Sequence, residues 1–249
     1  MKWGSFGPVH IATLILAALI IALLYMFLKN KSQKFQTAVL FILSFAGNAA
    51  TVYNLVAWGE PLDYLPLHLC ALNGLLLPIA VITRNKKLCN LLLLWSLGAF
   101  VALVANGTMA NAEISGLPFF FYYSAHVSEL GVPILLFSLG LVEKDSRCIG
   151  STLGITWATY TTVYGINKVI NCLCAVFHVL RADGSLVQVN YMYSMGPIDP
   201  LSGALWKILP CEYWYMLLAL PIIALYLCAL YAPQMTYRAH RHHSKYSLH

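Results

Sequence analysis

Residues 9–28, VHIATLILAALIIALLYMFL, form a mainly apolar run of 20 residues without Asp, Glu, Lys or Arg. A helix rises 1.5 Å per residue, so this stretch is about 30 Å long, the thickness of a bilayer's hydrocarbon core. The run therefore predicts a helix that crosses a membrane. No small-residue cleavage site follows it, so we expect no cleavable signal peptide.

The composition of the whole chain agrees with this segment. Of 249 residues, 60% are hydrophobic and only 10% are charged, whereas an ordinary soluble domain is about 45–50% apolar and about 25% charged. A soluble globular protein, a disordered chain and a nucleic-acid-binding module are excluded. We see no linker or composition break, and we expect one integral membrane domain over residues 1–249. The seven cysteines are an odd number, and several lie in apolar runs, which argues against a disulfide framework.

Apolar runs recur along the chain and predict an all-α, polytopic membrane helix bundle. In lipid, each helix satisfies its own backbone hydrogen bonds, and runs such as Leu91–Leu94 lack the alternation of a β-barrel. The predicted helices number seven and lie near residues 8–28, 37–58, 67–83, 88–110, 118–142, 148–170 and 211–232. Residues 148–180 form either one long tilted helix or a helix followed by an interfacial segment.

The charges of the connecting loops alternate and predict an orientation. Basic residues occupy the first, third and fifth loops and the C-terminal tail, whereas the second and fourth loops are acidic and the long sixth loop is mixed. By the positive-inside rule the basic loops face the cytoplasm, so the N-terminus lies outside and the C-terminus inside. The net charge of +6 is then explained by topology, and we expect no nucleic-acid partner. We expect a multi-pass protein of the cell membrane.

Polar residues within the apolar runs gather in the outer half of the predicted bundle. Such residues are costly in lipid and are where function is sought. His68, Cys70 and Asn73 lie near the start of the third span, and His126 lies within the fifth. Tyr164, Asn167 and Lys168 lie near the end of the sixth span, and Glu212 lies at the start of the seventh.

The fifth span carries one chemically distinctive face. Tyr122, His126 and Glu129 recur at i, i+4 and i+7, which places them on the same side of a helix. Glu129 falls near mid-membrane, where an ionised carboxylate needs a partner or a proton, and His126 is the nearest candidate. Pro133 removes the usual hydrogen bond to the carbonyl of Glu129 and predicts a kink beside the histidine.

A thiol and an imidazole from different spans suggest nucleophilic chemistry. Cys70 as nucleophile, His126 as its base and Glu129 orienting the ring form one hypothesis for acyl transfer. Cys70 shares a helix face with Asn73, whereas His68 lies on another side unless the first turn is distorted. An oxyanion or a lipid head group is expected to bind a set of polar side chains that includes Asn73, Tyr164, Asn167 and Lys168. Ordinary packing is the competing interpretation of Cys70, because free cysteine is usually buried and inert.

The remaining cysteines and histidines predict no metal site. Cys172 and Cys174 form a C-x-C pair with only His178 nearby, and a zinc site needs more ligands than this. We therefore expect neither a metal nor a cofactor.

Two segments resemble a known family. Residues 64–70, YLPLHLC, are similar to the Leu-Pro-Leu-His-Leu-Cys signature of the YwaF-like bacterial integral membrane proteins, and Asn190-Tyr191-Met192-Tyr193 with the later Pro and Trp-Tyr residues resembles their C-terminal motif. His126 falls where that family has its fifth-span histidine. The family is grouped with transmembrane protein 164.

The resemblance implies a phospholipid acyltransferase that uses a cysteine and a histidine. Cys70 would then form the acyl-enzyme and His126 would be its base, with membrane phospholipids as the partners. Asn190 and Tyr191 join the supporting residues through their motif. The stretch 171–189 is longer than the family pattern leads us to expect and leaves the lipid class open; the oligomeric state also stays open.

Two other functions remain. A multi-pass transporter or small-molecule receptor would use Glu129, Lys168 and the asparagines as a polar path, although the cytoplasmic halves of the spans are nearly all apolar. An interaction or scaffold protein is the third hypothesis, under which substitutions of Cys70 and His126 change stability alone.

Overall fold

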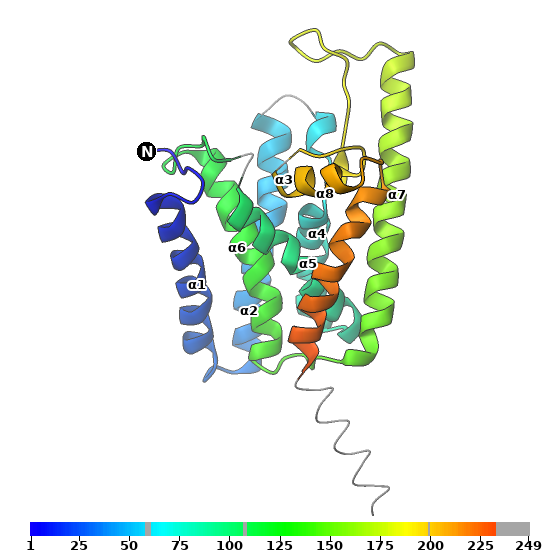
Figure 1. Cartoon of the computed structure of the whole chain (residues 1–249). Helices are drawn as coiled ribbons and strands as arrows, with labels where there is room; N and C mark the ends of the chain where they lie inside the picture. Colours follow the sequence, from blue (N-terminus) through cyan, green and yellow to red (C-terminus); the bar gives the residue numbers. More distant parts are fainter. Residues whose placement is uncertain (58–60, 107–108, 199, 233–249) are drawn as a thin grey trace, which may run out of the picture.

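The structure, a computed structural model, describes residues 1–57, 61–106, 109–198 and 200–232 (Figure 1). The fold is all-α, and the described residues contain only two isolated β-bridges, at Lys2 with Glu113 and at Leu180 with Leu186. The helices are α1 (Pro8–Leu28), α2 (Gln33–Leu43), α3 (Ala46–Ala57), α4 (Leu69–Thr83), α5 (Lys86–Ala105), α6 (Leu117–Ser138), α7 (Ile149–Val176) and α8 (Pro200–Ile208). Short 3₁₀ turns are η1 (Pro61–Tyr64), η2 (Ser146–Cys148), η3 (Tyr191–Tyr193) and η4 (Trp214–Ala219), the last continued by a helix over 220–232.

Five segments of the described chain are long and apolar enough to cross a membrane, so the predicted helical membrane fold is confirmed. They are Pro8–Leu28, Gln33–Ala57, Lys86–Ala105, Leu117–Ser138 and Trp214–Ala232. The predicted third span corresponds to α4, whose 15 residues make a helix of about 22 Å, short of the hydrocarbon thickness of about 30 Å. The count of seven spans stays a prediction.

Several predicted boundaries were wrong. The second span is two helices, α2 and α3, with a break at Ser44 and Phe45, where the Ser128 hydroxyl donates to the carbonyl of Leu43 at 2.5 Å. The predicted fourth and fifth spans run past the helix ends at Ala105 and Ser138. Residues 58, 107 and 108 of the predicted spans lie outside the described residues.

The sixth span extends beyond residue 170: α7 has 28 residues and runs to Val176, as in the alternative of one long helix. Asn171 lies near the predicted outer end of this span. Its side-chain amide donates to the carbonyl of Val189 at 2.9 Å, and its side-chain oxygen accepts from the backbone N–H of Val189 at 2.7 Å. A polar residue at this point of the chain therefore fastens a neighbouring segment to the helix and does not end it.

α5 is the central helix and explains the longest aliphatic run. It packs against α4, α6 and α7, and residues 91–94, all leucine, are buried. Residues 89–96 are all buried, and a helix segment that is covered on all sides needs no polar face, so four leucines can follow one another. α1 lies at the edge of the bundle (Figure 1), and many of its large apolar side chains are exposed, as expected of a lipid-facing helix.

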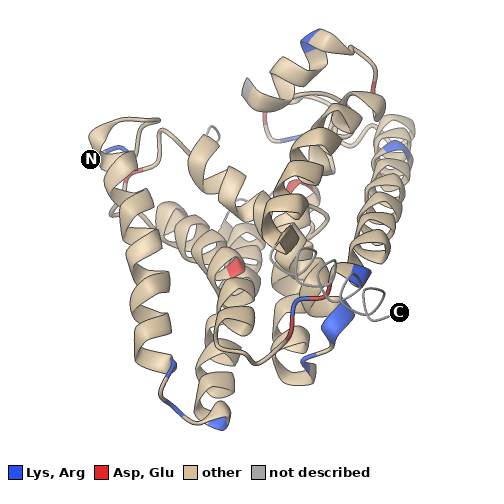
Figure 2. Cartoon of the chain, turned by 60° about the horizontal axis from the view of Figure 1, so that its bottom comes forward, with Lys and Arg blue, Asp and Glu red and all other residues tan. Residues whose placement is uncertain are grey.

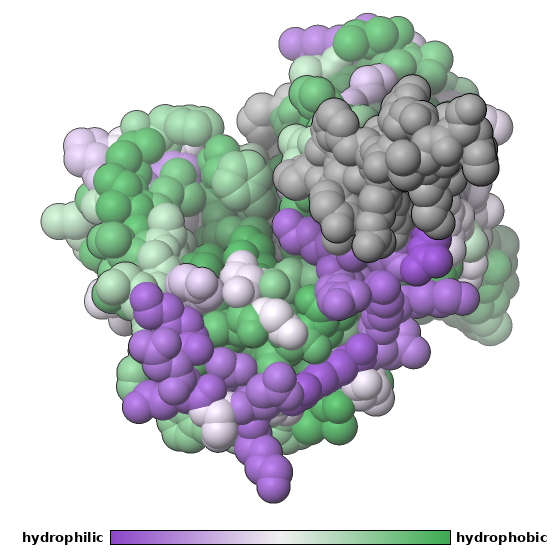
Figure 3. Space-filling view, turned by 90° about the horizontal axis from the view of Figure 1, so that it is seen from below, coloured by the Kyte–Doolittle hydropathy of each residue, from purple (hydrophilic) through white to green (hydrophobic). Residues whose placement is uncertain are grey.

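Basic side chains gather at the end of the bundle opposite the N-terminus (Figure 2). Viewed from below, hydrophilic side chains collect over this end (Figure 3). There the buried carboxylate of Asp145 lies 3.0 Å from Nζ of Lys86 and 2.9 Å from Nη2 of Arg147.

The other end of the bundle is covered by non-helical chain, which the sequence did not predict. The N-terminal segment is fastened to the end of α5, because Asn106 donates to the carbonyl of Gly4 at 2.5 Å and accepts from the hydroxyl of Ser5 at 2.8 Å. The loop after α7 and the short helix α8 lie at the same end (Figure 1). Buried loop backbone needs hydrogen-bond partners. This need explains why some of the polar side chains predicted for the outer half of the bundle lie at the same depth.

Candidate active site

Three polar side chains meet where α4 packs against α6. The sulfur of Cys70, a ring nitrogen of His126 and a carboxylate oxygen of Glu129 all lie within 4.8 Å of one another. Cys70 comes from α4, and the other two come from one face of α6. The structure thus brings together the three residues that the sequence grouped, and we call them the thiol–imidazole–carboxyl trio.

Cys70 is the second residue of α4 and is half-buried. His68 precedes the helix in extended conformation, and no side chain caps the helix start, so the backbone N–H groups of the first turn remain available. They give this end of the helix a partial positive charge. On α5, Gly98 leaves room beside the thiol, since a methyl group at that position would lie 3.6 Å from the sulfur.

The orientation of the His126 ring is fixed by its own helix. Nδ1 donates its hydrogen to the carbonyl of Tyr122 at 2.7 Å, and the two rings lie against each other with centroids 4.1 Å apart. With the proton held on Nδ1, the neutral ring carries its lone pair on Nε2. The half-buried imidazole is therefore set up to accept a proton at Nε2.

Glu129 is 2% exposed, and its carboxyl lies against two glycines. A methyl group on Gly47 of α3 would lie 2.5 Å from Oε1, and one on Gly74 of α4 would lie 3.1 Å from it. Only glycine lets α3 and α4 approach each other around this carboxyl. Oε2 has no hydrogen-bond partner within the described part of the chain, so Glu129 has an acceptor to offer within the trio.

The carbonyl freed by Pro133 finds its partner on another helix. Asn73, fully buried on α4, donates its side-chain amide to the backbone carbonyl of Glu129 at 3.3 Å. At the next residue of α4, Asn48 of α3 donates to the carbonyl of Gly74 at 3.0 Å. The carbonyl that Pro133 leaves without a helical donor is thus satisfied by Asn73, which acts here on the backbone of α6; the kink stays a prediction.

His68 faces away from the trio, in agreement with the predicted geometry. Its Nδ1 accepts from the backbone N–H of Met192 at 3.3 Å, and its ring packs against Tyr191 and Tyr193 of η3 at centroid distances of 5.7 and 5.6 Å. The hydroxyl of Tyr191 donates to the carbonyl of Leu62. Burial, with the charge of Asp63 nearby, raises the pKa of Tyr191 to about 12, so this phenol stays protonated as a donor.

The other predicted polar residues hold the loop above the bundle. Asn167 donates to the carbonyl of Tyr191 at 2.9 Å and accepts from its N–H at 3.1 Å, and Asn190 donates to the carbonyl of Gly196 at 2.8 Å. Lys168 pairs with Glu212 at 2.5 Å, and Tyr164 donates to the same carboxylate at 3.5 Å. These contacts are structural, and any role in binding lipid stays a prediction.

Three glycines near the trio, Gly47, Gly74 and Gly98, were not among the predicted site residues. The structure places the first two against the carboxyl of Glu129 and the third beside the sulfur of Cys70. The two cysteines of α7 differ in exposure: Cys172 is exposed and Cys174 is buried.

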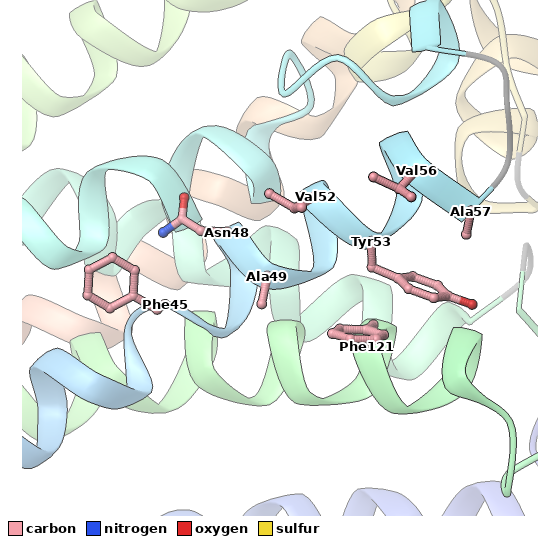
Figure 4. Close-up of a pocket in the computed structure, with 8 residues that line it drawn as sticks. All are labelled: Phe45, Asn48, Ala49, Val52, Tyr53, Val56, Ala57 and Phe121. Carbon is pink, nitrogen blue, oxygen red and sulfur yellow. The ribbon is translucent and has the colours of Figure 1, made fainter.

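An apolar groove runs along α3 (Figure 4). It has a volume of about 650 Å³, and the ring of Tyr53 stacks on Phe121 of α6 at one end with centroids 4.3 Å apart. Its lining residues are Phe45, Asn48, Ala49, Val52, Tyr53, Val56, Ala57 and Phe121. At 100° per residue most of them lie on the side of α3 opposite Gly47, so the helix separates the groove from the carboxyl of Glu129.

Comparison with known proteins gives one finding. No curated protein and no solved structure matches the chain. The sequence profile of the TMEM164 family matches residues 5–231, a range that includes α1 to α8 and all three members of the trio. The chain is therefore a membrane protein that belongs to the TMEM164 family.

Proposed function

We propose that this protein is an acyltransferase that moves an acyl chain from a phospholipid to a lysophospholipid through a thioester on Cys70. The observation that carries the proposal is the distance of at most 4.8 Å between the sulfur of Cys70 and a ring nitrogen of His126. A thiol becomes a strong nucleophile only as a thiolate. A nearby imidazole can remove the thiol proton, either through one bridging water or after a small side-chain rotation that brings the two groups together. The resemblance to transmembrane protein 164 points to the same chemistry.

In the first half-reaction, Nε2 of His126 takes the thiol proton and the sulfur attacks the ester carbonyl of a phospholipid. The oxyanion of the tetrahedral intermediate is stabilised by the first-turn N–H groups of α4, at the positive end of the helix. As the carbon–oxygen ester bond breaks, the leaving alkoxide takes the proton from His126. A lysophospholipid departs and the acyl chain stays on Cys70.

In the second half-reaction, a lysophospholipid hydroxyl gives its proton to His126 and attacks the thioester carbonyl. The carbon–sulfur bond breaks, and the thiolate of Cys70 recovers the proton from His126. If water takes the place of the acceptor, the same steps release a fatty acid. Glu129 stabilises the imidazolium that forms in each half-reaction, because its carboxyl lies within 4.8 Å of the ring.

The arrangement in the membrane is part of the proposal. The basic end of the bundle faces the cytoplasm by the positive-inside rule, which places the N-terminus outside the cell and the C-terminus inside in a multi-pass protein of the cell membrane. The start of α4 would then open toward the outer leaflet. Exposed apolar side chains such as Ile42, Val52 and Val56 give the helices a lipid-facing surface across which both substrates diffuse.

The test is acyl exchange by the purified protein in detergent–lipid micelles, with a phospholipid labelled in its acyl chain and an unlabelled lysophospholipid. We expect turnover in the wild type and in Cys172→Ser, and none in Cys70→Ala. Thermal unfolding of each variant separates loss of chemistry from loss of fold. Equal turnover in Cys70→Ala would reject the thiol as nucleophile, and uptake into proteoliposomes that depends on Glu129 would favour a transporter.

A further inference from the structure

The trio is also a set of metal ligands. Among the residues that the structure describes, Cys70, His126 and Glu129 are the one group of three His, Cys, Asp or Glu side chains whose ligand atoms lie close enough to share an ion. Thiolate, imidazole and carboxylate are the donors that Zn²⁺ binds in proteins. Their arrangement is consistent with a metal site as well as with a nucleophile and its base.

The geometry needs little adjustment. Zinc bonds of about 2.3 Å to sulfur, 2.0–2.1 Å to nitrogen and 2.0–2.2 Å to oxygen place tetrahedral ligand atoms about 3.5 Å apart. The ligand atoms of the trio lie within 4.8 Å, so small side-chain rotations close the set around an ion. Three protein ligands leave a fourth position open.

The surroundings of the ligands fit a metal as well. Nδ1 of His126 already donates to the carbonyl of Tyr122 at 2.7 Å, which leaves Nε2 for the ion, in the way that metal-bound histidines are usually held. Glu129 is 2% exposed and its Oε2 has no partner in the described chain. That buried and unpartnered oxygen is a second observation that points to a ligand.

The charges balance in the low-dielectric interior. A thiolate and a carboxylate carry two negative charges, and Zn²⁺ cancels both, whereas either anion alone inside the membrane is costly. When the ion binds, the thiol proton of Cys70, and the carboxyl proton of Glu129 where it is present, leave to solvent. Sulfur–zinc and oxygen–zinc bonds replace the two bonds to hydrogen.

We infer that Zn²⁺ binds to Cys70, His126 and Glu129 and thereby switches the enzyme off. A bound ion occupies the sulfur lone pair that would attack the ester and the Nε2 lone pair that would accept the proton. The inhibitory consequence rests on the proposed function, whereas the binding itself does not.

The first readout is binding. The C-terminal tail holds His240, His242, His243 and His249, which would bind metal on their own, so every variant carries alanine at these four positions. Co²⁺ replaces Zn²⁺ as a spectroscopic probe, because a cobalt–thiolate bond gives a charge-transfer absorption that histidine and carboxylate do not. We expect about one Co²⁺ per chain with this band, displaced by Zn²⁺.

The variants locate the site. Cys70→Ser should lose the thiolate band, His126→Ala and Glu129→Gln should weaken Co²⁺ binding at least tenfold, and Cys172→Ser should bind as the parent protein does. Thermal unfolding without metal confirms that each variant is folded. A band that persists in Cys70→Ser, or no Co²⁺ binding in the parent protein, would overturn the inference.

The second readout is acyl exchange. Zn²⁺ should abolish turnover and a chelator should restore it, whereas Mg²⁺, which prefers oxygen ligands, should have no effect. If Co²⁺ does not bind but turnover still depends on Cys70, the metal inference fails and the proposed function stands. If turnover requires the ion, the inhibitory role is wrong and the thioester mechanism fails with it.

Discussion

The side-chain amide of Asn73 on α4 donates a hydrogen bond to the backbone carbonyl of Glu129 on α6, over 3.3 Å. That carbonyl lacks its usual donor within the helix because residue 133 is proline. One hydrogen bond thus supplies the donor that Pro133 lacks and also joins the helix that carries Cys70 to the helix that carries His126.

This relationship predicts how substitutions of the two residues combine. Asn73→Ala leaves a buried carbonyl without a donor, which should lower the free energy of unfolding by about 1–3 kcal/mol. Pro133→Ala returns a backbone N–H to that carbonyl. In a double-mutant cycle followed by thermal unfolding in detergent, the cost of Asn73→Ala should therefore fall by about 1 kcal/mol when alanine occupies position 133. Equal costs in both backgrounds would mean that Asn73 does not compensate for the donor that Pro133 lacks.

The two glycines around Glu129 give a prediction about packing. A methyl group on Gly47 would lie 2.5 Å from Oε1 of Glu129 and 3.0 Å from the Cα of Gly74, so Gly47→Ala should destabilise the protein by about 1–3 kcal/mol. The matched control is Gly154→Ala on α7, where a methyl group meets nothing within 4 Å, and there alanine should be neutral or slightly stabilising. Similar melting temperatures for the two variants would contradict the close approach of α3 to α4.

The space beside the thiol can be tested at Gly98. A methyl group there would make an ordinary contact of 3.6 Å with the sulfur, so Gly98→Ala should keep most of the acyl exchange. The larger side chain in Gly98→Leu should fill the space that the acyl carbonyl needs and reduce turnover at least tenfold, with a smaller effect on stability. Unchanged turnover in Gly98→Leu would place the reacting carbonyl elsewhere.

The role of His126 as general base can be tested by substitution. His126→Ala should reduce turnover by about 10²–10⁴-fold, the usual contribution of a general base, and added imidazole should restore part of it by occupying the vacated space. His68→Ala is the comparison, because that ring packs on η3 and not on the trio. A larger loss of turnover in His68→Ala than in His126→Ala, at equal stability, would reverse the assignment.

Sidedness is tested by labelling intact cells with a membrane-impermeant maleimide. Ala182 lies in the loop after α7, and Lys31 lies between α1 and α2. With Cys172, Cys211 and Cys228, the exposed cysteines of the described chain, changed to serine, Ala182→Cys should react and Lys31→Cys should react only after permeabilisation. The opposite pattern would invert the proposed orientation.

The fold was predictable where hydrophobicity alone decides it. Helix surfaces that face lipid or are buried in the bundle are mostly apolar, and the long apolar runs of α1 and α5 predict these helices. The break between α2 and α3 was not predictable, since it depends on a hydroxyl from α6. The short amphipathic helix α8 and the turn η3 also gave no apolar run to find.

Part of the site was predictable for a different reason. Helical periodicity is a local property, so the shared face of His126 and Glu129 and the freed carbonyl follow from α6 alone. The approach of Cys70 depends on how α4 packs against α6 and α3, which the glycines permit but do not reveal in sequence. Sequence could not reveal that Asn167 and Asn190 bind loop backbone, because loop backbone that covers a membrane bundle needs the same polar residues that a binding site needs.

The most direct measurement is the mass of the peptide that contains Cys70 after the purified protein has met a phospholipid with an isotope-labelled acyl chain and no acceptor. The account predicts a labelled acyl group on Cys70 that hydroxylamine removes and that disappears when lysophospholipid is added. Labelled product formed at the normal rate while Cys70 remains unmodified, or label on another cysteine alone, would contradict it.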